Sequence, residues 1–293
     1  MHGSINTFGG NFDTGKSCRE PFTYHEARII ILPVPFDVMS SWNKGADKGP
    51  GAIIDASSQL EFYNIETDSE VYKKGIFTDE PVISAAPEDM IEKVQKKISQ
   101  YLADKKFPVI LGGDHSVTNG IFPALFGKYP DCSILHLDAH ADTRDEYEGS
   151  KYSHASVMAR ARTYTSSIIS AGIRSMEENE RRNILPKNLF LSNRIHKSRN
   201  WIKKIIKRLN RRVYITIDVD VFDSSFMPST GTPEPGGLTW LQVDELLQAV
   251  ACKKDIVGFD AVELCPSQNK APDFAVAKLI YNLLSYKFYS KNL

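Results

Sequence analysis

The sequence of 293 residues lacks several features that mark large classes of proteins. Lysine plus arginine and aspartate plus glutamate both number 36, so there is no basic excess of the kind that nucleic-acid-binding proteins carry. No apolar run reaches the roughly 18 residues of a membrane span, and residues 1–20 are polar and Gly-rich, without the apolar segment of a signal peptide. We therefore expect a protein that works without a nucleic-acid or membrane partner.

Cysteine is also scarce. The four cysteines are scattered and form neither a Cys-x-x-Cys pair nor a dense disulfide framework: Cys18, Cys132, Cys252 and Cys265. Their distribution argues against a thiolate metal site and predicts reduced thiols in a soluble, cytoplasmic protein.

Segments with the patterns of strands and helices alternate along almost the whole chain, without internal repeats or linkers. Such alternation is typical of an α/β domain with a mainly parallel sheet and helices on both faces. We predict one domain over residues 27–293, preceded by an arm at 1–26. One of the expected helices runs from Val117 to Phe126, with Pro123 as a possible kink.

The segment Ile134-Leu-His-Leu-Asp-Ala-His-Ala-Asp142 begins apolar and ends polar. If it is a strand throughout, Asp138, His140 and Asp142 lie on one face, because side chains alternate along a strand. His136 shares that face but lies further back, where core packing is the simpler interpretation. Carboxylates and imidazole at every second residue are groups that a divalent metal can use from one strand.

Two further strand ends carry the same kinds of side chain. His115 follows the strand that begins at Phe107, and the strand from Arg212 ends in Asp218 and Asp220. Since parallel strands end at the same edge of a sheet, all these groups can converge there. Four carboxylates and two imidazoles are enough for two metals, and an oxygen-rich set with imidazole suits Mn²⁺.

Four motifs give this chain a resemblance to the ureohydrolases, the arginase and agmatinase family. They follow the family's order and are Gly112-Gly-Asp-His-Ser116, Leu137-Asp-Ala-His-Ala-Asp142, Ile217-Asp-Val-Asp220 and Gly231-Thr-Pro-Glu-Pro-Gly-Gly237. The resemblance spans nearly all of the chain from Arg28 onward. It implies a three-layer α/β/α domain, a homo-oligomer (trimer or hexamer), two Mn²⁺ per subunit, and hydrolysis of a guanidine to urea and an amine.

The resemblance also implies a role for each matching residue. Asp138 and Asp218 would bridge two Mn²⁺ ions, with His115 and Asp142 completing one site. His140 and Asp220 would complete the other.

Three residues are expected to take part in catalysis: His154, Glu263 and Asp142. Glu263 matches the glutamate that binds the guanidinium, and His154 matches the histidine that handles the proton. Alone, His154 would be an ordinary surface or core histidine and Glu263 an ordinary acid at a strand end. The family usually has Gly after this histidine, whereas this chain has Ala155. The departure leaves the histidine in place, but the resemblance does not fix the shape of the loop around it.

The sequence favours agmatine as the substrate, with putrescine and urea as products. The arginase-type Ser-Gly-Asn segment is absent from Glu148–Ser153, and Pro233-Glu-Pro235 looks more like agmatinases. An acidic loop before His154 would suit a cationic tail. Guanidinobutyrate, arginine and other ω-guanidino compounds stay open as substrates, as does a metal-binding relative that serves as a scaffold without catalysis.

Overall fold

The structure is a computed structural model that describes residues 7–10 and 22–290. Within these residues, eight strands form one parallel sheet in the order β2-β1-β3-β8-β7-β4-β5-β6. The strands are β1 (Ile29–Val34), β2 (Ile76–Thr78), β3 (Phe107–Gly112), β4 (Ser133–Leu137), β5 (Ile168–Ile173), β6 (Leu189–Leu191), β7 (Arg212–Asp218) and β8 (Asp255–Val262). The predicted parallel sheet is confirmed.

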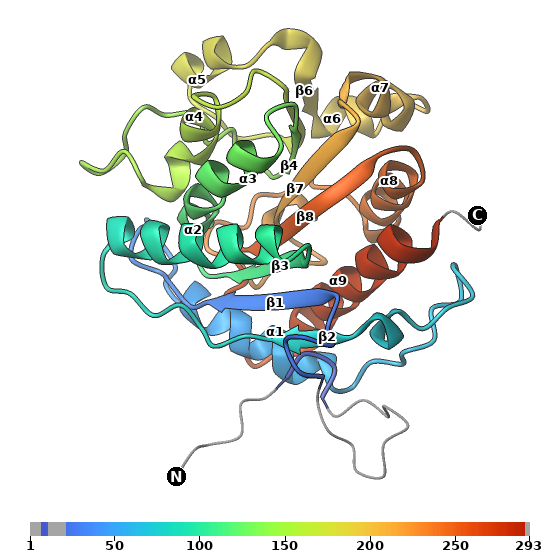
Figure 1. The fold of residues 1–293 in the computed structure, drawn as a ribbon. Coiled ribbons are helices and arrows are strands. Elements are labelled where there is room, and N and C mark those ends of the chain that lie inside the picture. Colours follow the sequence, from blue (N-terminus) through green and yellow to red (C-terminus); the bar gives the residue numbers. More distant parts are fainter. Residues whose placement is uncertain (1–6, 11–21, 291–293) are drawn as a thin grey trace.

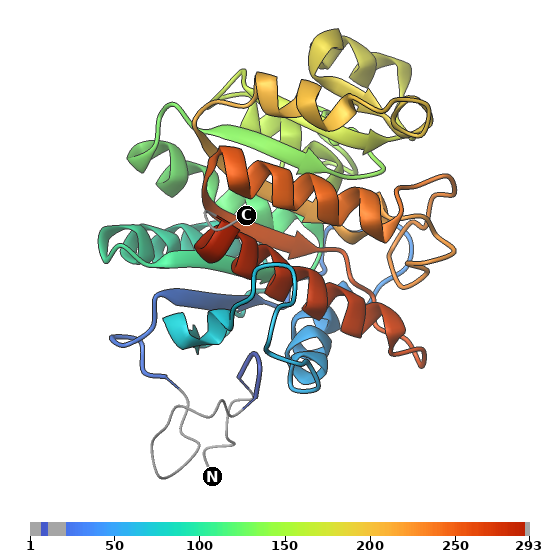
Figure 2. The same ribbon diagram turned by 90° about the vertical axis from the view of Figure 1, so that its right-hand side faces the viewer.

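Helices cover both faces of the sheet (Figure 1). On one face lie α2 (Pro87–Ala103), α3 (Phe122–Lys128) and α4 (Val157–Ala161). On the other lie α1 (Gly49–Ser57), α7 (Trp201–Arg208), α8 (Trp240–Lys253) and α9 (Ala271–Tyr289), and Figure 2 shows α8 and α9 lying in front of the sheet. The short helices α5 (Glu178–Asn183) and α6 (Ser192–Ile195) flank the β6 edge. The result is the predicted three-layer α/β/α architecture.

The alternation of side chains along each strand supplies both halves of the core. Ile29 and Ile31 of β1 pack in the cluster that includes α8 and α9, whereas Ile30 and Leu32 pack with α2 and α3. A strand buried on both faces has to be apolar at nearly every position, as β1 is. This two-sided burial leaves the carboxyl ends of the strands as the edge where polar groups gather.

Local sequence explains why one helix begins later in the structure than predicted. Residues His115–Gly120 form a 3₁₀ helix, and α3 then begins at Phe122, so the expected helix from Val117 is wrong in its start. Pro123 lies in the first turn of α3 and makes no kink. A proline there removes an N–H that would have no partner within the helix anyway.

Close backbone packing positions the turn after β3. A Cβ atom on Gly113 would lie 1.8 Å from the carbonyl oxygen of Phe36, so no other residue fits without moving the chain. The backbone N–H of Asp114 donates to the same carbonyl at 2.8 Å. This contact fixes the direction in which the chain leaves β3, and with it the position of His115.

Most of the predicted arm lies outside the described residues, because the structure does not describe residues 1–6 and 11–21. Of the part that is described, Phe8 is fully buried in the core, and its N–H donates to Thr78 at 2.9 Å. The boundary between arm and domain at residues 26 and 27 stays a prediction.

Candidate metal centre

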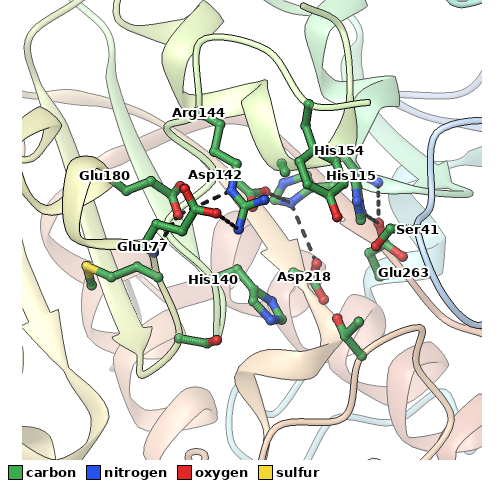
Figure 3. Close-up of a pocket in the computed structure, with 15 residues that line it drawn as sticks. Ser41, His115, His140, Asp142, Arg144, His154, Glu177, Glu180, Asp218 and Glu263 are labelled. Atoms are coloured by element: carbon green, nitrogen blue, oxygen red, sulfur yellow. Dashed lines mark hydrogen bonds and ion pairs between the residues drawn. The ribbon is translucent and has the colours of Figure 1, made fainter. Parts of the chain in front are cut away.

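The polar residues that follow β3, β4, β7 and β8 meet in one cavity of about 380 Å³ at the carboxyl edge of the sheet. Figure 3 shows their side chains pointing toward one another across this cavity. It is lined by six of the eight predicted site residues: His115, His140, Asp142, His154, Asp218 and Glu263. The other two, Asp138 and Asp220, are buried directly behind it and contact His115 and His140 respectively.

The first group of potential ligands surrounds His115, whose side chain is buried. Its Nδ1 atom lies 3.2 Å from Asp138 Oδ2, 3.0 Å from Asp142 Oδ2 and 3.6 Å from Asp218 Oδ2. Its Nε2 atom lies 2.8 Å from the hydroxyl of Thr216, which in turn donates to Asp260 at 2.6 Å. Because that hydroxyl gives its hydrogen to Asp260, it accepts from Nε2–H, which leaves the Nδ1 lone pair free to face the carboxylates.

This group has the features of a cation site. The Nδ1 atom of His115 is buried and makes no hydrogen bond within the described residues, although three carboxylate oxygens surround it. Burial, together with repulsion from Asp220 and Asp138, holds the pKa of Asp218 well above its usual range. Crowded, desolvated carboxylates of this kind are stabilised by a positive charge among them. The residues present therefore fit a divalent cation.

The second group consists of Asp138, His140 and Asp220, whose ligand atoms lie close enough together to hold one ion. His140 Nδ1 is 2.8 Å from Asp220 Oδ2 and 3.6 Å from Asp138 Oδ1. Burial alone would lower the pKa of His140, but the attraction of Asp220 and Asp138 outweighs it and raises that pKa to about 12. Asp138 contributes one oxygen to each group and lies between them.

The expectation that Asp138, His140 and Asp142 lie on one face of a strand is wrong. β4 ends at Leu137, and Asp142 has a positive φ of 53°. The side chains meet because the chain turns at the sheet edge after its last ladder hydrogen bonds, where Asp138 N still donates to Ala171 O at 3.2 Å. Aspartate tolerates a left-handed backbone better than most residues do, which suits it to this turn.

Glu263 and His154 lie beside the first group. Glu263 follows β8 with a φ of 66°, and its Oε1 atom accepts from the N–H of His115 at 2.7 Å. His154 Nδ1 is 3.6 Å from the same oxygen. Burial lowers the pKa of His154, but the neighbouring Glu263 outweighs this effect and raises it above its ordinary value. His154 opens a short 3₁₀ helix that Ser153 caps, and Ala155 continues it without a break.

Sequence reasoning missed several residues that line the cavity, among them Arg144, Glu177 and Glu180. Arg144 lies 3.2 Å from Glu177 and 3.5 Å from Glu180, and its guanidinium lies over the Tyr147 ring at 4.5 Å. Glu180 is buried and accepts from the N–H groups of Thr143 and Glu177. No metal-type spacing marks these residues. Only the acidic loop just after the second motif pointed toward this region.

A second cavity of about 420 Å³ adjoins the mouth. It shares Arg144, Tyr147, Glu177 and Glu180 with the first, and it adds three acids: Asp145, Glu146 and Glu148. The surroundings of the cavity mouth are therefore predominantly acidic.

The loop between β7 and α8 is held by Arg174. Within the described residues, every hydrogen bond of its guanidinium goes to a backbone carbonyl: those of Gly172, Asp220, Phe222, Glu234 and Pro235. This clamp ties the turn that carries Asp220 to the Pro-Glu-Pro segment. It also places the Glu234 carboxylate 3.9 Å from His140 Nε2.

In the part of the chain that the structure describes, no helix combines the length and the hydropathy of a membrane span. The expected trimer or hexamer and the expected cytoplasmic location stay predictions.

Comparison with known proteins agrees with this geometry. Residues 27–285 match the model of the Arginase family. The chain is 40% identical over 268 residues to the N(1)-aminopropylagmatine ureohydrolase of Thermus thermophilus, covering 90% of this chain and 92% of that protein. It is 32% identical over 270 residues to an agmatinase of Halalkalibacterium halodurans, covering 89% and 92%. The crystal structure of the agmatine ureohydrolase of Thermoplasma volcanium superposes with a TM-score of 0.86 at 31% identity, covering 98% of this chain and 96% of that chain. The chain belongs to the arginase family and is a ureohydrolase of that family.

Proposed function

We propose that this ureohydrolase contains two Mn²⁺ ions and cleaves the guanidine of agmatine, giving putrescine and urea. One observation carries the proposal. Two ligand groups share Asp138, and Glu263 and His154 lie beside them in the same cavity. Mn²⁺ is favoured over Zn²⁺ because the set is rich in carboxylates, contains two imidazoles and has no thiolate.

In this proposal Asp138 and Asp218 would be shared by the two ions. His115 and Asp142 would complete one site, and His140 and Asp220 would complete the other. Asp218 lies close to the first group, with its Oδ2 atom 3.6 Å from His115 Nδ1. Divalent cations held in this way act as Lewis acids and lower the pKa of water toward neutrality.

Glu263 and His154 would carry the remaining chemistry, and Asp142 lines the same cavity. A guanidinium presents paired N–H groups, and a carboxylate such as Glu263 binds them by charge-assisted hydrogen bonds. The amine leaves readily only when it is protonated. A protonated His154, 3.6 Å from the same carboxylate, lies where it can deliver that proton, directly or through water.

A second candidate substrate is N(1)-aminopropylagmatine, in which the tail carries one more amine. Two observations favour it: the relative that is 40% identical bears that name, and the second cavity beside the mouth carries three further acids. A tail with two ammonium groups gains more from an acidic surface than a tail with one. The products would then be spermidine and urea.

A substrate panel tests the proposal. The protein is loaded with Mn²⁺ and incubated with agmatine, N(1)-aminopropylagmatine, guanidinobutyrate or arginine. Urea release gives kcat/KM for each compound, and mass spectrometry identifies the amine product. We expect urea from the two amine-tailed compounds and far less from the two that carry a carboxylate. A variant with Asp138→Ala serves as the control for contaminating activity. If no member of the panel yields urea, the scaffold alternative is favoured.

A further inference from the structure

We propose that His136 is a positioning residue that holds the shared carboxylate of Asp138 in the orientation needed for two cations. The inference deepens the proposed function, because it concerns the same metal centre. Core packing was the expected role of His136, and its side chain is indeed fully buried. Its contacts, however, are those of a polar group with a defined task.

Both ring nitrogens of His136 have partners. Nε2 lies 2.7 Å from Asp138 Oδ2, and Nδ1 lies 3.2 Å from the hydroxyl of Ser170. Ser170 is the direct neighbour of His136 across the β4–β5 pairing, and it is also buried. A carboxylate can only accept, so Nε2 carries the hydrogen that it donates to Asp138.

This hydrogen bond leaves the Asp138 carboxylate with one free side on each oxygen. Oδ2 accepts from His136, and Oδ1 accepts from the backbone N–H of His140. On the other side, Oδ2 faces His115 Nδ1 at 3.2 Å and Oδ1 faces His140 Nδ1 at 3.6 Å. Each oxygen has two lone-pair directions, so a protein donor occupies one and the other remains for a cation. The two donors thus prevent the carboxylate from rotating and direct one oxygen toward each ligand group.

A direct ligand role for His136 is the competing interpretation, because its ring nitrogen lies near His115, Asp138 and Asp142. The contacts argue against it. The nitrogen that faces the carboxylate carries a hydrogen, and the other faces Ser170 on the neighbouring strand. Neither offers a lone pair toward the first group. Second partners of this kind are known to tune metal affinity by orienting the ligands.

The test compares His136→Leu, which removes the donor, with His136→Gln, whose side-chain amide can still donate. Mn²⁺ affinity is measured by competition with a fluorescent chelator, and bound metal is counted after dialysis at a fixed Mn²⁺ concentration. We expect His136→Leu to weaken the binding of Mn²⁺ by about 10–100-fold and His136→Gln to stay within about threefold of the wild type. Ser170→Ala leaves the Nε2 donor of His136 in place but removes the partner of Nδ1. It should weaken the binding of Mn²⁺ more than His136→Gln does and less than His136→Leu does.

Thermal unfolding of the metal-free proteins separates positioning from general stability. Ile134→Val, a mild core change two residues earlier on the same face of β4, is the matched control, and it should alter Tm without altering Mn²⁺ affinity.

The inference is overturned if His136→Leu binds Mn²⁺ as tightly as the wild type. It is also overturned if His136→Gln and His136→Leu lose a whole equivalent of metal alike, since His136 would then be a ligand. If His136→Leu does not fold, Ser170→Ala decides, and wild-type affinity in that variant counts against the proposal. Because the readout is metal binding, a wild type that binds two Mn²⁺ but releases no urea would contradict the proposed substrate and leave this test intact.

Discussion

Replacing Asp218 with asparagine should stabilise the metal-free protein while weakening its response to metal. Asp218 is buried, and its pKa is held well above its ordinary range by burial and by repulsion from Asp220 and Asp138. The neutral amide has nearly the same shape and removes that repulsion. In the presence of Mn²⁺ the same change removes one of the carboxylates proposed to bind the metal. The variant therefore separates the intrinsic stability of the fold from the stability that metal adds.

The size of the effect follows from the geometry. The Oδ2 atoms of Asp138 and Asp218 lie 3.2 and 3.6 Å from the same nitrogen of His115. Their separation is therefore at most about 7 Å, and at an effective dielectric constant of about 20 the repulsion is about 2 kcal/mol or more. Such a gain corresponds to roughly 3–4 °C in Tm for a domain of about this size, because the entropy of unfolding is about 2.1 cal/mol/K per residue.

A carboxyl whose pKa is raised by folding binds its proton more tightly in the folded chain. The contribution of Asp218 to the stability of the metal-free protein is then fully present below the ordinary pKa of about 3.9 and is lost as the pH rises through the raised value. The amide in the Asp218→Asn variant does not titrate, so the advantage of this variant should be small near pH 4 and largest near pH 8.

Differential scanning calorimetry of chelator-treated protein at several pH values measures the difference in Tm between the wild type and Asp218→Asn. Asp145→Asn, at an exposed carboxylate on the rim of the cavity, is the control and should change Tm little. Saturating Mn²⁺ should raise the Tm of the wild type more than that of Asp218→Asn. The reasoning fails if metal-free Asp218→Asn melts at or below the wild-type temperature at pH 8.

Three further predictions concern the proposed roles of individual residues. Asp138→Ala should abolish Mn²⁺-dependent urea release, since it removes an oxygen from both ligand groups, and wild-type turnover in this variant would refute the bridging role. His154→Ala should lower kcat by about 10²–10⁴-fold with both metals still bound, as counted by elemental analysis; loss of metal would show that its role is wrongly assigned. Glu263→Gln should lower the pKa of His154, because the glutamate raises it. NMR titration of the His154 ring in metal-free protein measures this, and an unchanged pKa would contradict the contact.

The family, the α/β/α fold and the class of enzyme were predicted from the sequence, and all three are confirmed. The reason is that strand ends carry strong local patterns. β3 ends at Gly112, with Gly113 next and His115 two residues further on, and β7 ends at Asp218, with Asp220 in the turn that follows. In a parallel sheet, finding the strands is enough to place their ends together.

Where prediction failed, the structure depends on contacts that are distant in sequence. β4 ends at Leu137, and Asp142 and Glu263 take positive φ values that no pattern of apolar residues indicates. β2 has only three residues and forms by pairing with β1. His136 is buried in the core as expected, but its contact with Ser170, 34 residues away, has no signal in the sequence. Arg144 and Glu180 meet at the mouth only after the chain has passed through β5.

The arginine clamp on the loop between β7 and α8 bears on how new substrates can arise. Because the guanidinium of Arg174 holds main-chain oxygens, exchanging a rim side chain that does not itself bind the loop backbone leaves this clamp in place. Asp223 is different, since its Oδ2 atom accepts from the N–H groups of Gly236 and Gly237. Mutations at Thr232 and Glu234 can therefore accumulate without releasing the clamp. Libraries randomised at Thr232 and Glu234 should thus retain the reaction centre while sampling different amines, which makes this rim a starting point for directed evolution.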